Sequence, residues 1–341
     1  MKRVCLLWIL LALSGSGQER PRPSKLEIRD LVRLPPTYAG LLLGSPKCDA
    51  DGNAYLVRYE PPLSNTVLRL GADGKTIVRF SLGGVADMEK SQLVDFAVGP
   101  QNQVFELTAH PGKEPGTTEA EIARFDNDGK ARGTIRLDVT DVVPRQLAIL
   151  PSGFLFVAGY RYKKSDTTTQ RVGFVGIFNE RGQLVSSVPL PETHAAADKR
   201  PSGPNLTESE ELLDISVAQP GPDGNIYLAR LTPRGPVFAV SPSGEPVAAH
   251  SLIPPQENMD LLDVKVSGGR LAAVYQGKED QNGTAPVWIR VTDISTDEVI
   301  ADYFHADYRI GVSLACYDPE IFTFVSSEEG RLQIVRAAPA R

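Results

Sequence analysis

The sequence predicts an all-β protein assembled from repeated four-stranded units, and three observations support this. Runs of β-branched, aromatic and aliphatic residues recur along the whole chain, as at residues 67–70 and 77–80. Turn dipeptides such as Gly52-Asn53 and Asp73-Gly74 separate the runs, because glycine and asparagine adopt positive φ at little cost. The same order of runs and turns returns after roughly 50 residues, which is typical of a repeat architecture.

The first repeat shows how one unit forms. The runs at residues 67–70 and 77–80 lie on either side of Asp73-Gly74, a strong signal for a β-hairpin. Five further copies follow, and the first strands of these copies are predicted at residues 93–98, 146–150, 213–217, 262–266 and 311–315. Each complete copy supplies four strands, whereas the sixth supplies three before the sequence ends.

The missing strand of the sixth copy is predicted at residues 26–34, just after the predicted leader and lead-in. A strand from the beginning of the chain that completes the last sheet closes a ring and removes two free sheet edges. The sequence therefore predicts a six-bladed β-propeller over residues 26–338, with the last blade closed by this N-terminal strand.

Two copies of one short motif connect the chain to known proteins. Residues 51–56 read Asp-Gly-Asn-Ala-Tyr-Leu and residues 223–228 read Asp-Gly-Asn-Ile-Tyr-Leu, while Gly74, Gly129 and Gly182 occupy the equivalent turns of other repeats. In these features the chain resembles the NHL-like and related six-bladed propeller repeat proteins. The resemblance implies the propeller fold, but it does not imply one function, because unrelated functions share this fold.

The first residues have the pattern of a secretory leader. A basic start at Lys2 and Arg3 precedes ten apolar residues, 4–13, and the small residues 14–17. Ten apolar residues are too few to span a bilayer comfortably, which argues against a membrane anchor. We expect residues 1–17 to be a signal peptide, residues 18–25 to be a flexible lead-in, and the protein to be secreted or periplasmic.

Charge excludes one class of partner. The formal net charge is −6 and becomes −8 when Lys2 and Arg3 leave with the predicted leader. Proteins that bind a phosphate backbone present a basic face, and no cluster of Lys and Arg is found here. We therefore expect no nucleic-acid partner, and a monomer that does not insert into a membrane.

Two cysteines, Cys48 and Cys316, remain after the predicted leader. They hold equivalent places in the first and sixth repeats, which are neighbours across the predicted ring closure. An even count and an oxidising compartment favour a disulfide between them. The alternative is two buried free thiols, because equivalent positions on adjacent inner strands can be too far apart to bond.

Three carboxylates recur at one repeat position. Asp95, Asp214 and Asp263 follow Leu-Val, Leu-Leu and Leu-Leu at the start of the innermost strand, which predicts similar heights near the central channel. Gathered carboxylates there would suit Ca²⁺ or another hard cation. The alternative is that each accepts hydrogen bonds from backbone amides between blades, and the counterpart Gln146 makes an acidic ring incomplete.

The histidines do not suggest a metal or catalytic site. His110 and His194 are predicted in loops, and His250 and His305 near the ends of outer strands, so no two share a metal-ligand spacing. The sequence also lacks a Gly-x-Ser-x-Gly elbow, a phosphate-binding glycine loop and a His-Glu-x-x-His motif.

Two functions are compatible with these observations. The first is a non-catalytic binding or scaffold module that recognises a protein, peptide or glycan across one face, using the loops of varied length near residues 108–119, 160–170, 189–211 and 277–286. The second is a metal-dependent hydrolase or lactonase resembling gluconolactonase-like propellers. The Glu-Gly-Pro-x-Trp stretch of that family is absent, and the single Trp beyond the leader, Trp288, is predicted in a third strand. The sequence therefore favours the binding module.

Overall fold

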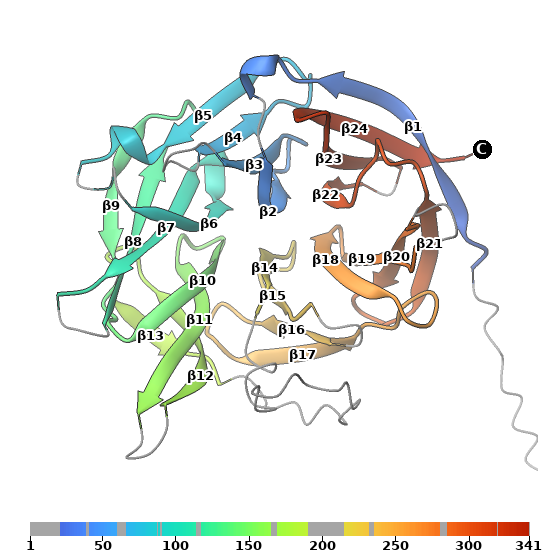
Figure 1. Ribbon diagram of the computed structural model, residues 1–341. Coiled ribbons are helices and arrows are strands. Elements are labelled where there is room, and N and C mark those ends of the chain that lie inside the picture. Colours follow the sequence, from blue (N-terminus) through green and yellow to red (C-terminus); the bar gives the residue numbers. More distant parts are fainter. Residues whose placement is uncertain are drawn as a thin grey trace, which may run out of the picture.

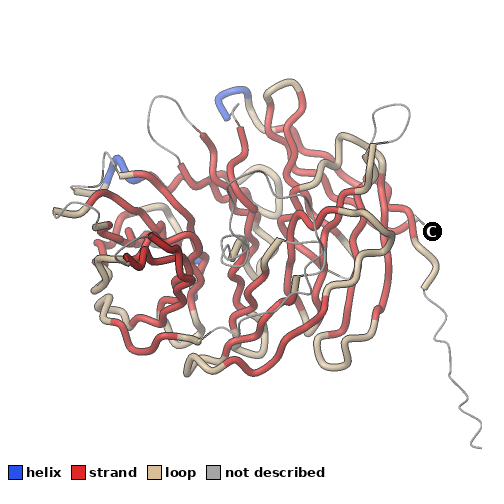
Figure 2. Tube along the Cα trace, turned by 60° about the horizontal axis from the view of Figure 1, so that its bottom comes forward, coloured by secondary structure: helices blue, strands red, loops and turns tan. Residues whose placement is uncertain are grey.

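The computed structural model is an all-β propeller, in which antiparallel sheets stand around a central axis (Figure 1). It describes residues 21–38, 41–59, 66–86, 88, 91–113, 117–164, 169–189, 215–231, 235–279, 285–318 and 320–340. Strands make up most of this part of the chain, and loops and turns lie at their ends (Figure 2). None of the helices in the described residues has the length and apolar character that a membrane crossing needs.

Four of the sheets are four-stranded meanders in which each strand pairs with the next along the chain. The first contains β2 (Leu41–Cys48), β3 (Ala54–Tyr59), β4 (Thr66–Leu70) and β5 (Ile77–Ser81). The second contains β6 (Gln92–Val98), β7 (Val104–Pro111), β8 (Thr118–Phe125) and β9 (Ala131–Arg136). The third contains β10 (Val142–Ile149), β11 (Leu155–Lys164), β12 (Thr169–Phe178) and β13 (Leu184–Ser187). The fourth contains β14 (Val217–Pro220), β15 (Ile226–Ala229), β16 (Pro236–Val240) and β17 (Pro246–Ser251).

The fifth sheet has eight strands in the order β18-β19-β20-β21-β1-β24-β23-β22. Its strands are β18 (Asp260–Ser267), β19 (Arg270–Gln276), β20 (Val287–Asp293), β21 (Val299–His305), β22 (Ser313–Tyr317), β23 (Phe322–Glu328), β24 (Arg331–Pro339) and β1 (Ser24–Arg33). Three short 3₁₀ helices complete the described elements, η1 (Pro36–Tyr38), η2 (Leu82–Gly84) and η3 (Pro100–Asn102).

Strand β1 is the link that makes this sheet large. It pairs antiparallel with β24 from Leu26↔Pro339 to Arg33↔Gln333. At its start it also pairs in parallel with β21, through Ser24↔Tyr303 and Lys25↔Phe304. The prediction of an all-β propeller is thus confirmed, and so is the pairing of the N-terminal strand with the last sheet. The structure has four four-stranded sheets and one eight-stranded sheet. The eight-stranded sheet arises because β1 pairs with both β21 and β24, the last strands of the fifth and sixth predicted repeats.

Apolar side chains between neighbouring sheets form the core. Phe80 of β5 and Phe125 of β8 meet edge to face with ring centroids 6.0 Å apart, and within the eight-stranded sheet Tyr303 of β21 meets Phe322 of β23 at 4.9 Å. Five of the apolar clusters combine residues of two adjacent sheets. The sixth lies between the two halves of the eight-stranded sheet. Burying one such side chain stabilises the fold by about 1.5–3 kcal/mol, so the contacts between sheets hold the ring together.

Glycine is required where a turn packs against the previous sheet. Gly129 and Gly182 have φ of 82° and 78°, a conformation that side chains with a Cβ rarely adopt. A Cβ at Gly129 would overlap the Arg79 carbonyl of β5, and one at Gly182 would overlap the Arg136 carbonyl of β9. The recurring Asp-Gly and Arg-Gly turns therefore serve both the hairpin and the contact between sheets.

The Asp-Gly-Asn-x-Tyr motif has a structural role. Asp49 Oδ1 accepts the amide hydrogens of Asp51 and Asn53, and its Oδ2 accepts the Tyr55 hydroxyl at 2.9 Å. In the second copy Asp223 Oδ2 accepts the Tyr227 hydroxyl at 2.8 Å. In both copies a turn carboxylate thus binds the hydroxyl of the motif's buried tyrosine, but this carboxylate is Asp49, two residues before the motif, in the first copy and Asp223, its first residue, in the second.

Candidate functional site

A cavity of about 830 Å³ lies on the central axis. Its wall consists of the innermost strands β2, β6, β10, β14, β18 and β22, which surround the centre in Figure 1. It opens among the turns that follow these strands, where Ala50, Pro222 and Ile321 line it. This volume is within the range of ligand-binding pockets.

A repeated β-bulge decides which side chains point into the cavity. The register of the innermost strand shifts between Leu93 and Asp95 in β6 and between Leu261 and Asp263 in β18. The bulge turns the next side chain in a new direction and increases the local twist. Asp95 and Asp263 therefore do hold the same repeat position, as the sequence predicted, and Gln146 follows the equivalent shift in β10.

Asp95 bridges three sheets. Both of its carboxylate oxygens lie 3.0 Å from Nζ of Lys47 on β2, and Oδ2 also accepts the amide hydrogen of Leu147 on β10 at 2.7 Å. Lys47 Nζ donates in addition to the Phe96 carbonyl. Burial lowers the pKa of Lys47, whereas Asp95 works against that shift.

Asp263 belongs to a second ion pair on the opposite wall. Its Oδ2 lies 3.0 Å from Lys265 Nζ and accepts the Ser45 hydroxyl at 2.6 Å. Lys265 Nζ also donates to the Pro46 carbonyl at 2.6 Å, so this side chain reaches from β18 to β2. Both members of the pair are almost fully buried.

We call Ser45, Lys47, Asp95, Gln219, Asp263 and Lys265 the polar belt. Gln219 of β14 extends it, since its side-chain amide accepts from Val266 N at 3.2 Å and donates to the Val266 carbonyl at 3.4 Å. The belt joins five of the innermost strands across the inner end of the cavity. Its two lysines and two aspartates balance each other, so it adds little net charge.

The predicted ligands of the cation site are Asp95, Asp214 and Asp263. Asp214 lies outside the described residues. Asp95 and Asp263 each bind a lysine ammonium. Asp95 also accepts the amide hydrogen of Leu147 from the next sheet, whereas Asp263 accepts that of the adjacent Val264 in its own strand. Within the described ranges, no three His, Cys, Asp or Glu residues come together as metal ligands. The Ca²⁺ site itself stays a prediction.

The sequence interpretation missed Lys47 and Lys265. Lys265 is two residues after Asp263 in a regular part of β18, so the alternation of side chains places this pair on one face. This alternation was the available signal for Lys265. In β2 the register shifts between Leu43 and Lys47, so alternation does not relate Lys47 to Ser45 in the same way. The partner of Lys47, in contrast, is 48 residues away, and no local pattern identifies it.

The disulfide between Cys48 and Cys316 is confirmed. It joins the last residue of β2 to β22, with the two Cα atoms 5.2 Å apart. Both cysteines line the cavity, so the bond forms part of its wall where the first and last repeats meet.

Three neutral polar side chains of the described lining are left for a ligand, and Ser267 of β18 is one of them. Thr323 of β23 is 8% exposed and lines the cavity, and Gln146 of β10 lines it nearer the polar belt. None of the three side chains makes a hydrogen bond to another described residue. Between them the wall consists mainly of small apolar residues such as Ala97, Ala218 and Val266.

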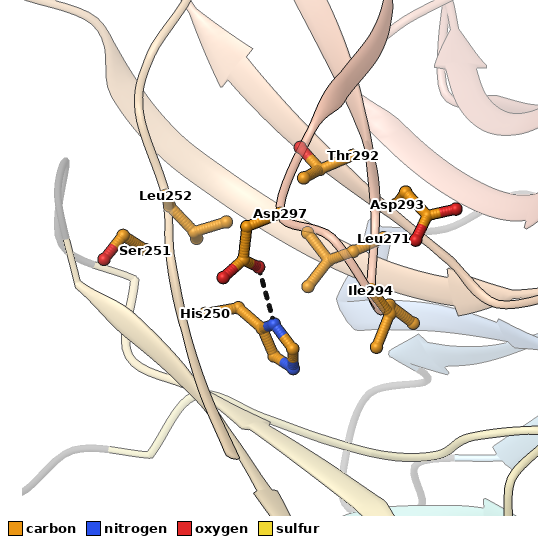
Figure 3. A pocket seen from close by; sticks show the side chains of 8 residues that line it. All are labelled: His250, Ser251, Leu252, Leu271, Thr292, Asp293, Ile294 and Asp297. Carbon is orange, nitrogen blue, oxygen red and sulfur yellow. Dashed lines mark hydrogen bonds and ion pairs between the residues drawn. The ribbon is translucent and has the colours of Figure 1, made fainter.

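A second, very small cavity lies between β17 and the β20–β21 turn (Figure 3). His250 and Asp297 come from these two segments and point toward each other, with Nδ1 and Oδ1 2.8 Å apart. The cavity of about 10 Å³ has the size of one water molecule. The buried Nε2 of His250 has no hydrogen-bond partner among the described residues. The contact between His250 and Asp297 joins β17 to the β20–β21 turn, and the cavity beside it is too small for an organic ligand.

The other histidines are not at the central cavity. The prediction of a loop at His110 was wrong, because β7 extends to Pro111 and His110 pairs with Glu119 of β8. His305 ends β21, as predicted, and packs edge to face on Phe324. His194 lies outside the described residues.

Glu106 is a buried acid outside the cavity. It lies on β7 with an exposed fraction of 0%, and no hydrogen bond reaches either carboxylate oxygen. Burial raises its pKa to about 8, although the Val67 amide of β4 acts in the opposite direction. A carboxyl group in such surroundings stays protonated near neutral pH.

Replacement of Glu106 with Gln is expected to remove a pH dependence of stability. From pH 6.5 to about 7.5 the folded protein keeps most of the Glu106 proton, whereas the unfolded chain has lost it. The free energy of unfolding should therefore fall as pH rises, by about 1.4 kcal/mol per pH unit, and this fall should be absent in Glu106→Gln. Urea unfolding at several pH values measures it.

Measuring above pH 6.5 avoids most of the effect of His305 titration on stability. Burial lowers the pKa of His305 to about 4, so its contribution to stability is lost as pH falls below the ordinary histidine pKa of 6.5. Glu180→Gln, at an exposed turn, is the matched control and should keep the wild-type slope. A Glu106→Gln variant with an unchanged slope would show that Glu106 is ionised in the folded protein.

Comparison with known proteins adds information about the fold. No family model and no curated protein matches this chain. Among solved structures, the phage phi92 endosialidase has a TM-score of 0.52 at 10% identity, over 92% of this chain and 69% of that chain. A luciferin-regenerating enzyme has a TM-score of 0.45 at 11% identity over 91% and 95% of the chains, and YCF48 bound to D1 peptide has 0.43 at 11% over 90% and 96%. The likeness to the endosialidase, at 10% identity, shows the fold alone.

Proposed function

We propose that this protein is a non-catalytic binding module, acting outside the cytoplasm, that holds a segment of a partner protein in its central cavity. The observation that carries the proposal is the cavity of about 830 Å³, lined by small apolar residues with Thr323, Gln146 and Ser267 left for hydrogen bonds. A few convergent polar groups in an apolar pocket are typical of ligand recognition.

The lining favours a peptide over a glycan. Tyr317 is the one aromatic residue among the lining residues of the described cavity, and the rest of its wall offers no flat ring on which a sugar would stack. Small apolar side chains and free hydrogen-bonding groups suit instead the side chains and backbone of a peptide.

The charges of the cavity favour binding over catalysis. Lys47 and Lys265 each pair with a carboxylate, and Arg336 at the opening pairs with Asp30. A general base or a metal ligand needs a carboxylate that is free to accept a proton or a cation. At the inner end of the cavity Asp95 and Asp263 are engaged by ammonium groups. The other lining carboxylates, Asp49 and Asp318, lie at its opening.

Two further proposals concern the setting of the site. We propose that the ring has six blades, dividing the eight-stranded sheet between β21 and β1, because two residue pairs join these strands in parallel while a long antiparallel ladder joins β1 to β24. We also propose secretion or a periplasmic location, which the disulfide and the leader-like first residues support. The NHL-like resemblance stays a prediction.

Filling the cavity is expected to abolish peptide binding. Random peptides displayed on phage would be selected on the immobilised protein, sequenced and synthesised. Gln146→Trp places a large side chain in the cavity without breaking a hydrogen bond, and should weaken the selected peptides at least tenfold, by about 1.4 kcal/mol or more. Isothermal titration calorimetry measures the affinity.

The control variant is Gln92→Trp, since Gln92 is exposed on β6 and does not line the described cavity. It should bind the selected peptides as the wild type does. Thermal unfolding of both variants checks that they fold. Peptides that bind equally well to Gln146→Trp would mean that the cavity is not the binding site.

A further inference from the structure

The rim of the cavity has one sign of charge. It consists of the six turns that join the innermost strands to the second strands, at residues 49–53, 99–103, 150–154, 221–225, 268–269 and 318–321. We call these turns the inner rim. Because neighbouring strands in each sheet are antiparallel, all six turns lie at the same face of the ring.

The inner rim contains five carboxylates, Asp49, Asp51, Asp223, Asp318 and Glu320, and its sequence has no Lys, Arg or His. Asp51, Asp223, Asp318 and Glu320 are exposed. The hydrogen bonds that Asp49 and Asp223 accept come from neutral groups, so they leave the negative charges in place.

The lysines and arginine that line the cavity do not offset this charge. Lys47 and Lys265 belong to the neutral polar belt, and Arg336 is paired with Asp30. Burial raises the pKa of the lining residue Tyr317, and Arg270, which follows the 268–269 turn, lies close enough to work against that rise. Arg270 therefore adds one positive charge beside the opening. Five carboxylates against this one arginine leave the balance at the opening negative. Carboxylates around a concave, low-dielectric opening concentrate their field there and attract cationic partners.

Inside the inner rim the cavity lining is neutral and mainly apolar. Thr323, which is 8% exposed and has no hydrogen-bond partner among the described residues, lines the cavity together with small apolar residues. The polar belt at the inner end carries no net charge that would pair with a buried ion, so a neutral residue fits this space better than a charged one.

We propose that the inner rim and the cavity select a basic peptide segment, in which lysine or arginine residues flank a short neutral centre. The basic residues lie against Asp51, Asp318 and Glu320 at the rim, and the neutral centre enters the cavity and reaches Thr323. This assignment rests on the proposed binding function and adds the chemical class of the partner.

The test uses two labelled nine-residue peptides, one with three lysines on each side of an Ala-Val-Ala centre and one with glutamates in place of the lysines. Fluorescence anisotropy with the whole protein should show the lysine peptide binding at least tenfold more tightly. Raising NaCl from about 50 to about 300 mM should weaken it, because salt screens exposed charges.

Two triple variants distinguish the effect of the inner-rim carboxylates on peptide affinity from the effect of the protein's net charge. Asp51→Asn/Asp318→Asn/Glu320→Gln keeps every side-chain shape and should weaken the lysine peptide about tenfold, since each exposed ion pair contributes a fraction of a kcal/mol. Glu257→Gln/Glu279→Gln/Glu329→Gln removes the same charge from exposed turns at the opposite ends of the strands and should leave the affinity unchanged.

Equal loss in both triple variants, or equal affinity for the two peptides, would overturn the assignment. Absence of binding by the lysine peptide would overturn it as well. The phage selection distinguishes this failure from that of the proposed function: selected peptides that depend on the cavity but are not basic would leave the binding function standing and remove only the basic partner.

Discussion

Replacing Cys48 and Cys316 together with serine is expected to lower the free energy of unfolding by about 2–5 kcal/mol. The bond joins residues 268 positions apart, so in its absence the unfolded chain gains the freedom of nearly the whole propeller. The same bond holds the innermost strands β2 and β22 together where the first and last repeats meet. Urea unfolding of the oxidised wild type and the double variant measures the difference.

A reductant provides the matching control. Dithiothreitol should lower the urea midpoint of the wild type toward that of Cys48→Ser/Cys316→Ser and should not affect the variant. If the wild-type midpoint is the same with and without reductant, the bond does not contribute to stability in solution. The reduced wild-type sample must contain free Cys48 and Cys316 thiols. A thiol-reactive dye confirms their number.

Replacing Asp302 with Ala is expected to cost about 3–5 kcal/mol, because it leaves a buried guanidinium without its counter-charge. Arg290 Nε and Nη2 donate to the two oxygens of Asp302 at 2.8 and 2.7 Å, and both side chains are about 5% exposed. Arg290 Nη1 also donates to the Ile253 carbonyl at 2.8 Å, so this pair fixes the connection between β17 and β18. Chemical unfolding gives the change in free energy.

The double variant Arg290→Met/Asp302→Leu should lose less stability than Asp302→Ala, since no charge stays buried without a partner. An exposed pair gives the scale for comparison: Glu328→Ala breaks the contact of Glu328 with Arg33, whose side chain is 60% exposed, and should cost less than about 1 kcal/mol. A loss in Asp302→Ala as small as in Glu328→Ala would show that water reaches Arg290.

Most of the strand pattern could be predicted from the sequence because each hairpin depends on neighbouring residues. The Asp73-Gly74 turn and its two apolar runs lie within fifteen residues of each other, and β4 and β5 form there. The predicted pairing of residues 26–34 with the last strand also needed only the count of strands. The His110 prediction failed because β7 continues beyond the apolar run that identified it, supported by its pairing with β8.

The binding surface was harder to predict. The sequence suggested recognition by long loops near residues 108–119, 160–170, 189–211 and 277–286. In the first two, β7, β8, β11 and β12 occupy most of the described residues, and residues 190–211 of the third lie outside the described part of the chain. The described cavity opens instead among the short inner turns. Short turns differ little between repeats of one fold, so their lengths carry no signal. The signal in them is charge, which becomes visible once the turns are known to surround one opening.

By itself the sequence determined the strands, their order, the closure by β1 and the cysteine pair, because strand periodicity, turn chemistry and repeat position are properties of nearby residues or of simple counting. Only the tertiary structure decided that Asp95 binds Lys47 and that Ser45 binds Asp263, 48 and 218 residues away. Such partners depend on the width of the central channel and on the bulges that aim side chains into it. Both follow from how all the sheets pack around the axis, and no single segment encodes them.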